Sequence, residues 1–286
     1  MTARYVLASD RPVLLRPDGA VQVGWDPRSA VLVRPPAGIT QAQLAGLLHA
    51  LQGGLTKAEL STATAQFGTG ADSTVDQVIA ALSAAGVLTV PPPVTPHRPA
   101  RTASIRIHGR GPISELLAGA LRCSGARVRR SATPHAASVP EHTDLVVLAD
   151  YLITEPRLLR ELHRCGVAHL PVLVRDGAGL VGPLVLPGVM SCLQCADLHR
   201  SDRDGAWPAV AVQLRGAVGS ANRATILATA ALALRQVDLV IRAVGDTGDP
   251  NLKPEPPPTL DTTLELDSTG YGIVARRWSR HPDCSC

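Results

Sequence analysis

The sequence predicts an α/β protein, a doubly wound and mostly parallel sheet with a C-terminal antiparallel part, preceded by a small winged-helix-like α+β domain. Three observations predict it. Strand-like and helical segments alternate from residue 104 to residue 286, as in doubly wound sheets. A proline-rich segment at 91–103 separates them from residues 1–90, because repeated prolines exclude helix and central strand. Two short cysteine pairs lie far apart in the second part.

Residues 1–90 contain three strand-like segments and then three helical segments. The strand-like segments are PVLLR, AVQVGW and AVLVR, which are rich in branched aliphatic residues. We expect the first helix to have Thr40 as its N-cap and Gly53 as its stop, and the second to begin with a capping box of Thr56 and Glu59. The third, DSTVDQVIAALSAAG, has one apolar face. With the short strand VLTV after it, this order resembles a winged helix-turn-helix.

The charge of this first domain argues against nucleic-acid binding. From residue 38 to residue 96 the only basic residue besides histidine is Lys57, and the third helix carries Asp72 and Asp76 with no base. A DNA-reading helix needs cations on or beside it, so we expect no nucleic-acid partner. Two alternatives stay open: a domain that serves only for packing, and peptide capture by addition of a strand to the sheet edge.

Residues 104–286 begin with a strand, a glycine-rich turn, a helix and a strand in SIRIHGRGPISELLAGALRCSGARVRR. The buried strand DLVVLAD ends at Asp150, and a helix in EPRLLRELHRCG, the strand PVLVRDG and a hairpin in LVGPLVLPG follow. A long helix covers GSANRATILATAALALRQVDLVIRAVG, and two antiparallel strands lead to the last cysteine pair. Cys123 and Cys165 fall in helical patterns, and we expect both to be buried as small apolar residues.

The glycine-rich turn is an incomplete dinucleotide fingerprint. Gly109 and Gly111 permit a tight turn and close approach of a phosphate to a helix N-terminus, but Ser114 replaces the third glycine and arginines stand where the ribose acid is expected. A purely structural turn is the favoured interpretation, and a nucleotide site is the alternative. Asp150 could hold Mg²⁺ beside a triphosphate or cap the following helix.

The cysteine pairs predict a metal site. Cys192 and Cys195 form a CxxC pair, and Cys284 and Cys286 form a CxC pair, each in a turn-forming context. Four thiolates suit tetrahedral Zn²⁺, and a closed four-thiolate site is structural because it leaves no open position for catalysis. We therefore expect structural zinc on these four residues.

The sequence also bears on the compartment. The N-terminal residues have no long apolar stretch, and the longest candidate span, 224–244, is interrupted by Arg235, Asp238 and Arg242. We expect no membrane span and a cytoplasmic protein, where paired cysteines are more often metal ligands than disulfides.

A resemblance to a known family rests on the order of five segments: GRGPISELLAGAL, DLVVLAD, GPLVLPGVMSCLQCADLHR, AVGSANRATILATAALALRQVDLV and HPDCSC. This order is similar to the ThiF-like, ubiquitin-activating-type adenylation fold. Within that superfamily, CLQCADLHRSDRDGAWPAVAVQL resembles the azoline or bacteriocin cyclodehydratase components and leader-peptide-binding proteins. The resemblance implies an ATP and Mg²⁺ site at Gly109, Gly111 and Asp150, closure of the zinc site by the last cysteine pair, and a homodimer.

The resemblance also implies a role for the first domain. In the similar proteins a winged-helix element binds a leader peptide along its third strand and third helix. By element order these correspond to Ala30–Arg34 and Asp72–Ala85. The implied peptide contacts are Val31, Val33, Val75 and Ile79.

Three hypotheses about function follow. The first is a scaffold that is not catalytic alone: it binds a precursor peptide and presents it to a YcaO-type cyclodehydratase, which in the similar proteins performs the ATP-dependent backbone chemistry. The second is an active ATP-dependent adenylating enzyme, although the chain's two lysines, Lys57 and Lys253, lie outside the region where that family needs one. The third is a housekeeping interaction protein with a degenerate nucleotide site.

Overall fold

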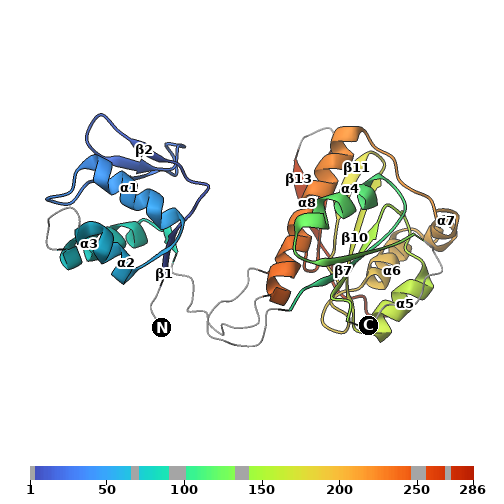
Figure 1. Ribbon diagram of the computed structural model, residues 1–286. Helices are drawn as coiled ribbons and strands as arrows, with labels where there is room; N and C mark the ends of the chain where they lie inside the picture. The colour runs from blue at the N-terminus through green and yellow to red at the C-terminus, as the bar shows by residue number, and fades with distance from the viewer. Residues whose placement is uncertain (1–3, 66–70, 90–100, 133–141, 246–255, 268–271) are drawn as a thin grey trace. The chain divides into compact units, whose positions relative to one another are not determined.

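The computed structural model divides into two compact units, Met1–His97 and Arg98–Cys286, which are described separately (Figure 1). Much of the proline-rich segment expected at 91–103 lies outside the described residues. The structure describes residues 4–65, 71–89, 101–132, 142–245, 256–267 and 272–286.

The first unit contains two small antiparallel sheets. One has the order β2-β3-β4, and in the other β1 lies between β5 and β6. The sequence prediction contained β2, β3, β4 and β6 but neither β1 nor β5. The strands are β1 (Arg4–Leu7), β2 (Val13–Leu15), β3 (Val21–Val23), β4 (Val31–Val33), β5 (Leu55–Thr56) and β6 (Leu88–Thr89).

Three helices, α1 (Gln41–Gln52), α2 (Lys57–Ala65) and α3 (Ala71–Ala84), complete this unit. The predicted helix starts of α1 and α2 are confirmed. The N–H of Glu59 donates to Oγ1 of Thr56 at 3.2 Å, while the N–H of Thr56 donates to Oε2 of Glu59 at 2.7 Å. The apolar faces of these helices enclose a core with β1, β3 and β4. Its largest fully buried members are Leu7, Leu44, Leu48, Leu51, Leu60 and Leu82.

The second unit is a mixed α/β layer structure around a seven-stranded sheet of order β13-β12-β11-β10-β9-β7-β8. The strands from β10 to β8 run parallel, and the pairs β10–β11, β11–β12 and β12–β13 are antiparallel. The fold class expected from the sequence is thus confirmed at this level, with a larger antiparallel share. The strands are β7 (Ser104–His108), β8 (Arg127–Ser131), β9 (Leu145–Ala149), β10 (Ala168–Arg175), β11 (Ala178–Val181), β12 (Thr262–Leu266) and β13 (Ile273–Arg277).

Helices cover both faces of this sheet because β9 is apolar on both sides. Side chains alternate between the faces of a strand, so Val147 enters the core beneath α4 and α8, whereas Val146 and Leu148 meet Leu158 and Leu162 of α5. This arrangement places the carboxyl ends of β7 and β9 side by side. The helices are α4 (Pro112–Ala120), α5 (Pro156–Arg164), α6 (Leu193–Arg203), α7 (Trp207–Gln213) and α8 (Arg223–Gly245), with a 3₁₀ turn at Leu121–Cys123.

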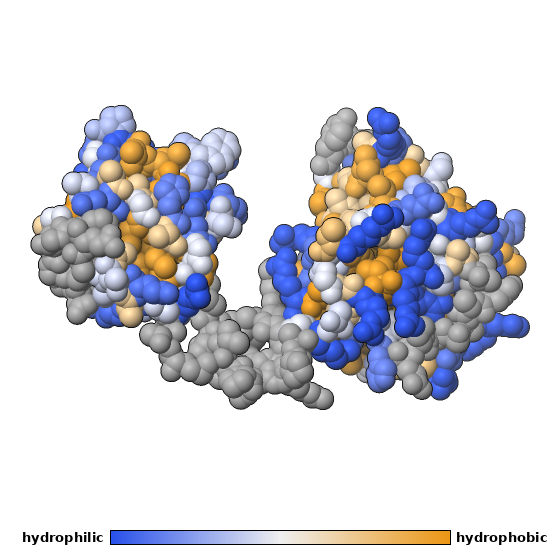
Figure 2. Space-filling view, viewed as in Figure 1, coloured by the Kyte–Doolittle hydropathy of each residue, from blue (hydrophilic) through white to orange (hydrophobic). Residues whose placement is uncertain are grey.

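Helix α8 is long and apolar enough to cross a membrane by length and composition, although a third of its most apolar window is buried within the fold. Its buried residues, including Ala233 and Val237, pack on the sheet. Such packing is typical of a core helix. Figure 2 shows apolar atoms at the surface over the upper part of α8, where Leu227 is exposed.

Two local predictions are wrong. The hairpin is formed by β10 and β11 around Asp176-Gly177, both with positive φ, rather than within LVGPLVLPG. Cys123 and Cys165 are exposed instead of buried, because each follows the end of a helix rather than lying on its inner face.

Candidate functional site

The four cysteines converge at one corner of the second unit. Cys192 is the N-cap of α6 and Cys195 lies in its first turn, while Cys284 and Cys286 come from the C-terminal segment. The Sγ–Sγ distances are 3.8 Å for 192–195, 3.6 Å for 192–284 and 3.5 Å for 195–286, and all four sulfurs lie within 4.8 Å of one another. A tetrahedral ion with metal–sulfur bonds of about 2.3 Å separates its sulfurs by about 3.8 Å. The cluster could therefore bind a metal ion such as Zn²⁺.

The electrostatics of the cluster also suit a cation. Burial raises the pKa of the Cys192 thiol. Burial also acts upward on the Cys195 thiol, but backbone hydrogen bonds at Cys192 and His281 outweigh it and lower the pKa of Cys195 to about 7. Cys195 therefore loses its proton more readily than Cys192, and a bound cation would favour the thiolate form of its ligands.

Polar side chains brace the cluster from outside. Nε2 of the buried His281 lies 2.8 Å from a carboxylate oxygen of Asp202 on α6, and its Nδ1 accepts the N–H of Asp283 at 3.1 Å. Nε2 must then carry the proton, which leaves the ring without a free lone pair for a metal. Asp261 accepts from the N–H and the hydroxyl of Ser191, next to the first cysteine. Sequence reasoning did not identify Ser191 and Asp261 as a pair, because they are 70 residues apart and neither stands in a recognisable motif.

The glycine-rich turn is filled from within by Asp150. The N–H groups of Ile113 and Ser114 donate to Oδ1 and Oδ2 of Asp150 at 2.9 and 3.1 Å, and the carboxylate is 1% exposed. Pro112 has no N–H, and the N–H of Glu115 bonds to the carbonyl of Gly111. The first turn of α4 therefore has every backbone donor occupied, and none is left for a phosphate oxygen.

Gly109 and Gly111 leave the space that Ala149 and the Asp150 side chain occupy. A Cβ on Gly111 would lie 2.7 Å from Cγ of Asp150, and one on Gly109 would lie 2.2 Å from the carbonyl oxygen of Ala149. Both positions need glycine so that the end of β9 can approach the turn. Asp150 has φ of 70°, a left-handed conformation that aspartate tolerates. It caps α4, which precedes it in the chain, rather than the helix that follows.

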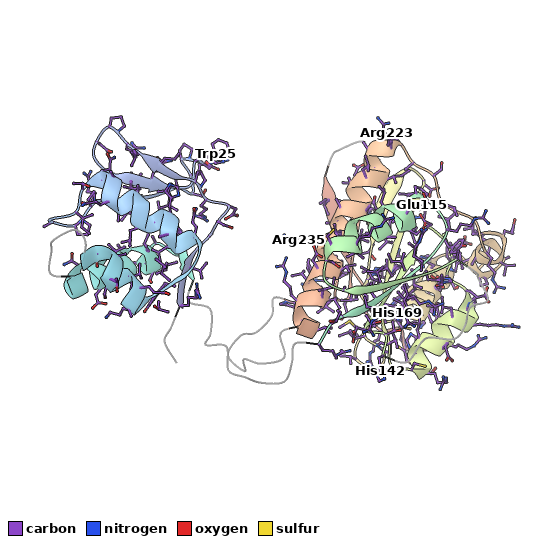
Figure 3. All side chains as sticks on the ribbon, in the orientation of Figure 1. Trp25, Glu115, His142, His169, Arg223 and Arg235 are labelled. Atoms are coloured by element: carbon purple, nitrogen blue, oxygen red, sulfur yellow. The ribbon has the colours of Figure 1, made fainter. Side chains whose placement is uncertain are left out.

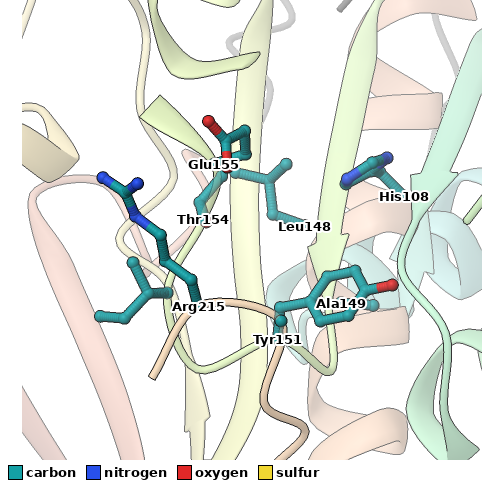
Figure 4. A pocket seen from close by; sticks show the side chains of 9 residues that line it. His108, Leu148, Ala149, Tyr151, Thr154, Glu155 and Arg215 are labelled. Carbon is teal, nitrogen blue, oxygen red and sulfur yellow. The ribbon is translucent and has the colours of Figure 1, made fainter. Parts of the chain in front are cut away.

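A small pocket that opens to solvent lies at the carboxyl ends of β7 and β9 (Figure 4). Its apolar floor includes Leu148 and Ala149, and its polar groups include His108, Glu155 and Arg215. Burial lowers the pKa of His108 to about 4, and the charge of the neighbouring Arg106 adds to this shift. The imidazole is therefore neutral near pH 7 and adds no positive charge for a triphosphate.

The implied peptide contacts of the first unit fall into two groups. Val33 and Val75 are 5% and 1% exposed and belong to the core. Their side chains are therefore not accessible to a peptide, which corrects the expectation that they contact one. Val31 and Ile79 are half-buried against that core. Leu32 points to the opposite face of β4 and is 52% exposed, since side chains alternate along a strand. The alternation in Val31-Leu32-Val33 was the signal that could have identified Leu32.

The sheet β2-β3-β4 carries further exposed apolar residues. Leu14 on β2 and Leu32 on β4 lie opposite Gln22 of β3 in one row across the outer face. Trp25, at the turn after β3, projects from the surface and is largely exposed (Figure 3). In this unit the described residues therefore form an apolar surface beside the free edge of β4, a combination that suits an extended peptide.

Comparisons with known proteins agree with this fold. No family model and no curated protein matches the chain. Among solved structures, the heterocyclase TruD is similar with a TM-score of 0.67 at 18% identity, over 99% of this chain and 42% of that one. MccB of E. coli, solved with ATP, is similar with a TM-score of 0.62 at 13% identity over 99% of both chains. MccB in complex with N-formylated MccA gives the same TM-score and identity. The chain thus spans about two fifths of the heterocyclase, and the similarity supports a ThiF-like fold.

Proposed function

We propose that this protein is a scaffold of ribosomal peptide modification that is not catalytic alone. Its first unit binds the leader segment of a precursor peptide, and the protein presents that peptide to a separate YcaO-type cyclodehydratase. The observation that carries the proposal is the occupied N-terminus of α4, where Asp150 takes the place that a triphosphate needs. TruD, a heterocyclase, and MccB, which was solved with MccA, supply the setting of peptide modification.

The proposed partner is the one that the family resemblance implies. This chain spans 42% of TruD, a heterocyclase, and 99% of MccB. A separate YcaO-type enzyme would supply the ATP-dependent step that the occupied turn does not support. The chain would then act in the cytoplasm together with that enzyme and the precursor.

The backbone of β4 supports peptide capture at its free edge. In an antiparallel ladder, every second pair of opposite residues is joined by backbone hydrogen bonds. Between β2 and β3, Arg16 bonds to Ala20 and Pro12 bonds to Gly24, so the pair between them, Leu14 and Gln22, is also a bonded pair. Gln22 therefore bonds to β2, and the backbone groups of Val21 and Val23 face β4. It follows that Val31 and Val33 bond to β3, whereas the N–H and C=O of Leu32 point outward. An extended leader segment would pair with Leu32.

Leu32→Pro tests this assignment. The substitution removes the outward N–H without removing a ladder hydrogen bond, and proline is tolerated on an edge strand. We expect leader binding to weaken by about tenfold or more, measured by fluorescence anisotropy of a labelled precursor peptide encoded beside the YcaO-type enzyme. Leu32→Val keeps the N–H and is the matched control. Equal affinity of both variants would contradict strand addition at β4.

We also propose that the four cysteines hold Zn²⁺ and that the protein forms a homodimer, as the resemblance implies. The sulfur distances support the first statement. Light scattering of the purified protein tests the second. We expect a mass of twice 29.9 kDa, and a monomeric mass at micromolar concentration would contradict it.

A further inference from the structure

Strand β13 forms one edge of the seven-stranded sheet, and no described strand pairs with its outer side. All five of its residues are exposed. Ile273 and Val274 are 56% and 46% exposed, although both are aliphatic. An open edge with apolar side chains is a template for another strand, which proteins ordinarily protect.

The hydrogen-bond pattern of β13 identifies the backbone groups that face outward. The N–H of Trp278 donates to the carbonyl of Asp261, and the N–H of Asp267 donates to the carbonyl of Gly272. Because hydrogen-bonded pairs alternate along the ladder, Val274 bonds to Glu265 and Arg276 bonds to Thr263 of β12. The N–H and C=O groups of Ile273, Ala275 and Arg277 therefore point away from the sheet and are available to a new strand.

An open groove with a volume of about 410 Å³ lies between β13 and α6. Its side walls are basic and aromatic, and no carboxylate is among its described lining residues. Arg276 pairs with Glu265, whereas Arg203 and Arg277 have no ion pair among the described residues. The residues that line it are His199, Arg203, Val274, Ala275, Arg276, Arg277, Trp278 and Ser279.

Aromatic stacking fixes the end of the groove. Trp278 donates its indole N–H to Oγ1 of Thr263 at 2.9 Å, and the guanidinium of Arg200 lies 5.4 Å from its ring centre and 5.2 Å from that of Trp207. Arg200 also pairs with Asp197 at 2.7 Å. The wall is therefore preorganised, which reduces the entropy lost when a ligand binds.

We propose that β13 and this groove bind an acidic, extended segment of the precursor peptide, which adds to the sheet as an eighth strand. Its backbone pairs with Ile273, Ala275 and Arg277, and its acidic side chains reach Arg277 on one face of the sheet and Arg203 of α6 on the other face. This inference rests on the proposed function in naming the precursor as the source of the segment. It adds a second peptide site, in the unit that does not carry β4.

A second copy of the chain fits this edge less well. Antiparallel pairing of two β13 strands centred on Ala275 would place Arg277 of each copy opposite Ile273 of the other, so it would bring no carboxylate to Arg277. An acidic strand instead brings opposite charge to the same positions, so charge complementarity favours the peptide.

The test uses the full chain and a synthetic probe. The probe is a fluorescein-labelled peptide of about ten Glu and Val residues in the repeat Glu-Glu-Val-Val, which places carboxylates on both faces of one strand. Its partner replaces Glu with Lys. We expect the acidic peptide to bind and the basic one to bind about tenfold more weakly or worse, with affinity falling as salt is raised. No binding of the acidic probe at low salt, or equal binding of both, would overturn the proposal.

Two variants locate the site. Ala275→Pro removes an outward N–H without breaking the ladder with β12 and should weaken the acidic probe by about tenfold. The double variant Arg203→Glu with Arg277→Glu should reverse the preference, so that the basic probe binds more tightly. Arg122→Glu, an exposed change outside the groove, is the matched control. Unchanged preference in the double variant would place the binding elsewhere and overturn the proposal even if Ala275→Pro fails to fold.

Two further measurements distinguish the β13 site from the β4 site, and strand addition from general binding of polyanions. Leu32→Pro should leave the acidic probe unaffected while it weakens the leader, so failure at β13 is distinguishable from failure of the proposed function at β4. A labelled oligo-dT strand tests whether the groove is a general polyanion site. Binding of this strand tighter than that of the acidic peptide, and insensitive to Ala275→Pro, would contradict strand addition.

Discussion

Cys195→Ser is expected to abolish the proposed zinc binding and to lower the unfolding temperature of the second unit by about 10 °C or more. The thiolate of Cys195 contacts two of the other sulfurs and ties α6 to the C-terminal segment. Metal-binding free energy in four-ligand zinc sites is largely folding free energy, and a domain of this size loses about 2–4 °C per kcal/mol. Zinc content by mass spectrometry and calorimetric unfolding measure both effects.

Cys123→Ser is the matched control for this prediction. Cys123 is exposed and outside the cluster, so its substitution should leave the zinc content and unfolding temperature unchanged. Removal of zinc from the unsubstituted protein with a chelator should reproduce the effect of Cys195→Ser. Metal-free and metal-loaded protein that unfold at the same temperature would show that the four thiols do not form a structural metal site.

Asp150→Ala is expected to destabilise the protein by about 3–5 kcal/mol. The substitution leaves the buried N–H groups of Ile113 and Ser114 without acceptors, at about 1–3 kcal/mol each. It also places alanine at a φ of 70°, which costs roughly 1 kcal/mol more. Urea unfolding followed by circular dichroism measures the change in free energy.

Two further variants of Asp150 separate these causes. Asp150→Gly relieves the backbone conformation but still lacks the acceptors, so it should be slightly more stable than Asp150→Ala. Asp150→Asn keeps one oxygen for one N–H and tolerates the left-handed conformation, so its loss should be the smallest. Stability equal to that of the unsubstituted protein in all three would mean that the carboxylate does not cap α4.

Local signals predicted the helix starts well. The capping box of Thr56 and Glu59 involves residues three positions apart, so its geometry is contained in the sequence itself. The cysteine pairs were likewise recognisable, because a structural zinc site needs four thiolates and each pair supplies two. Cys192 and Cys284 are therefore expected to lie close together although they are distant in the chain.

Contacts that depend on sheet order could not be predicted in this way. The hydrogen bonds from the first turn of α4 to Asp150 exist only because β7 and β9 are adjacent parallel strands, although β8 comes between them in the chain. The sequence left open whether Asp150 holds a cation or caps a helix. The open edge of β13 has the same origin, since strand order rather than composition decides which strand lies at an edge.

The mapping of peptide contacts shows the limit of element order. It located β4 and α3 as elements but selected Val33 and Val75, which the core requires. Strand alternation separates Val33 from Leu32, and burial of a helix position depends on how α3 packs. Physical position on a face, rather than position in the element order, therefore decides which side chain can meet a peptide.

The central claim is that Asp150 closes the phosphate site and that the protein serves as a scaffold. Calorimetric titration of the zinc-loaded full chain with Mg-ATP tests it most directly. We predict no heat of binding at two temperatures, because every donor of the first turn of α4 is already bonded. Stoichiometric binding with a dissociation constant in the micromolar range would contradict the account and favour an active adenylating enzyme.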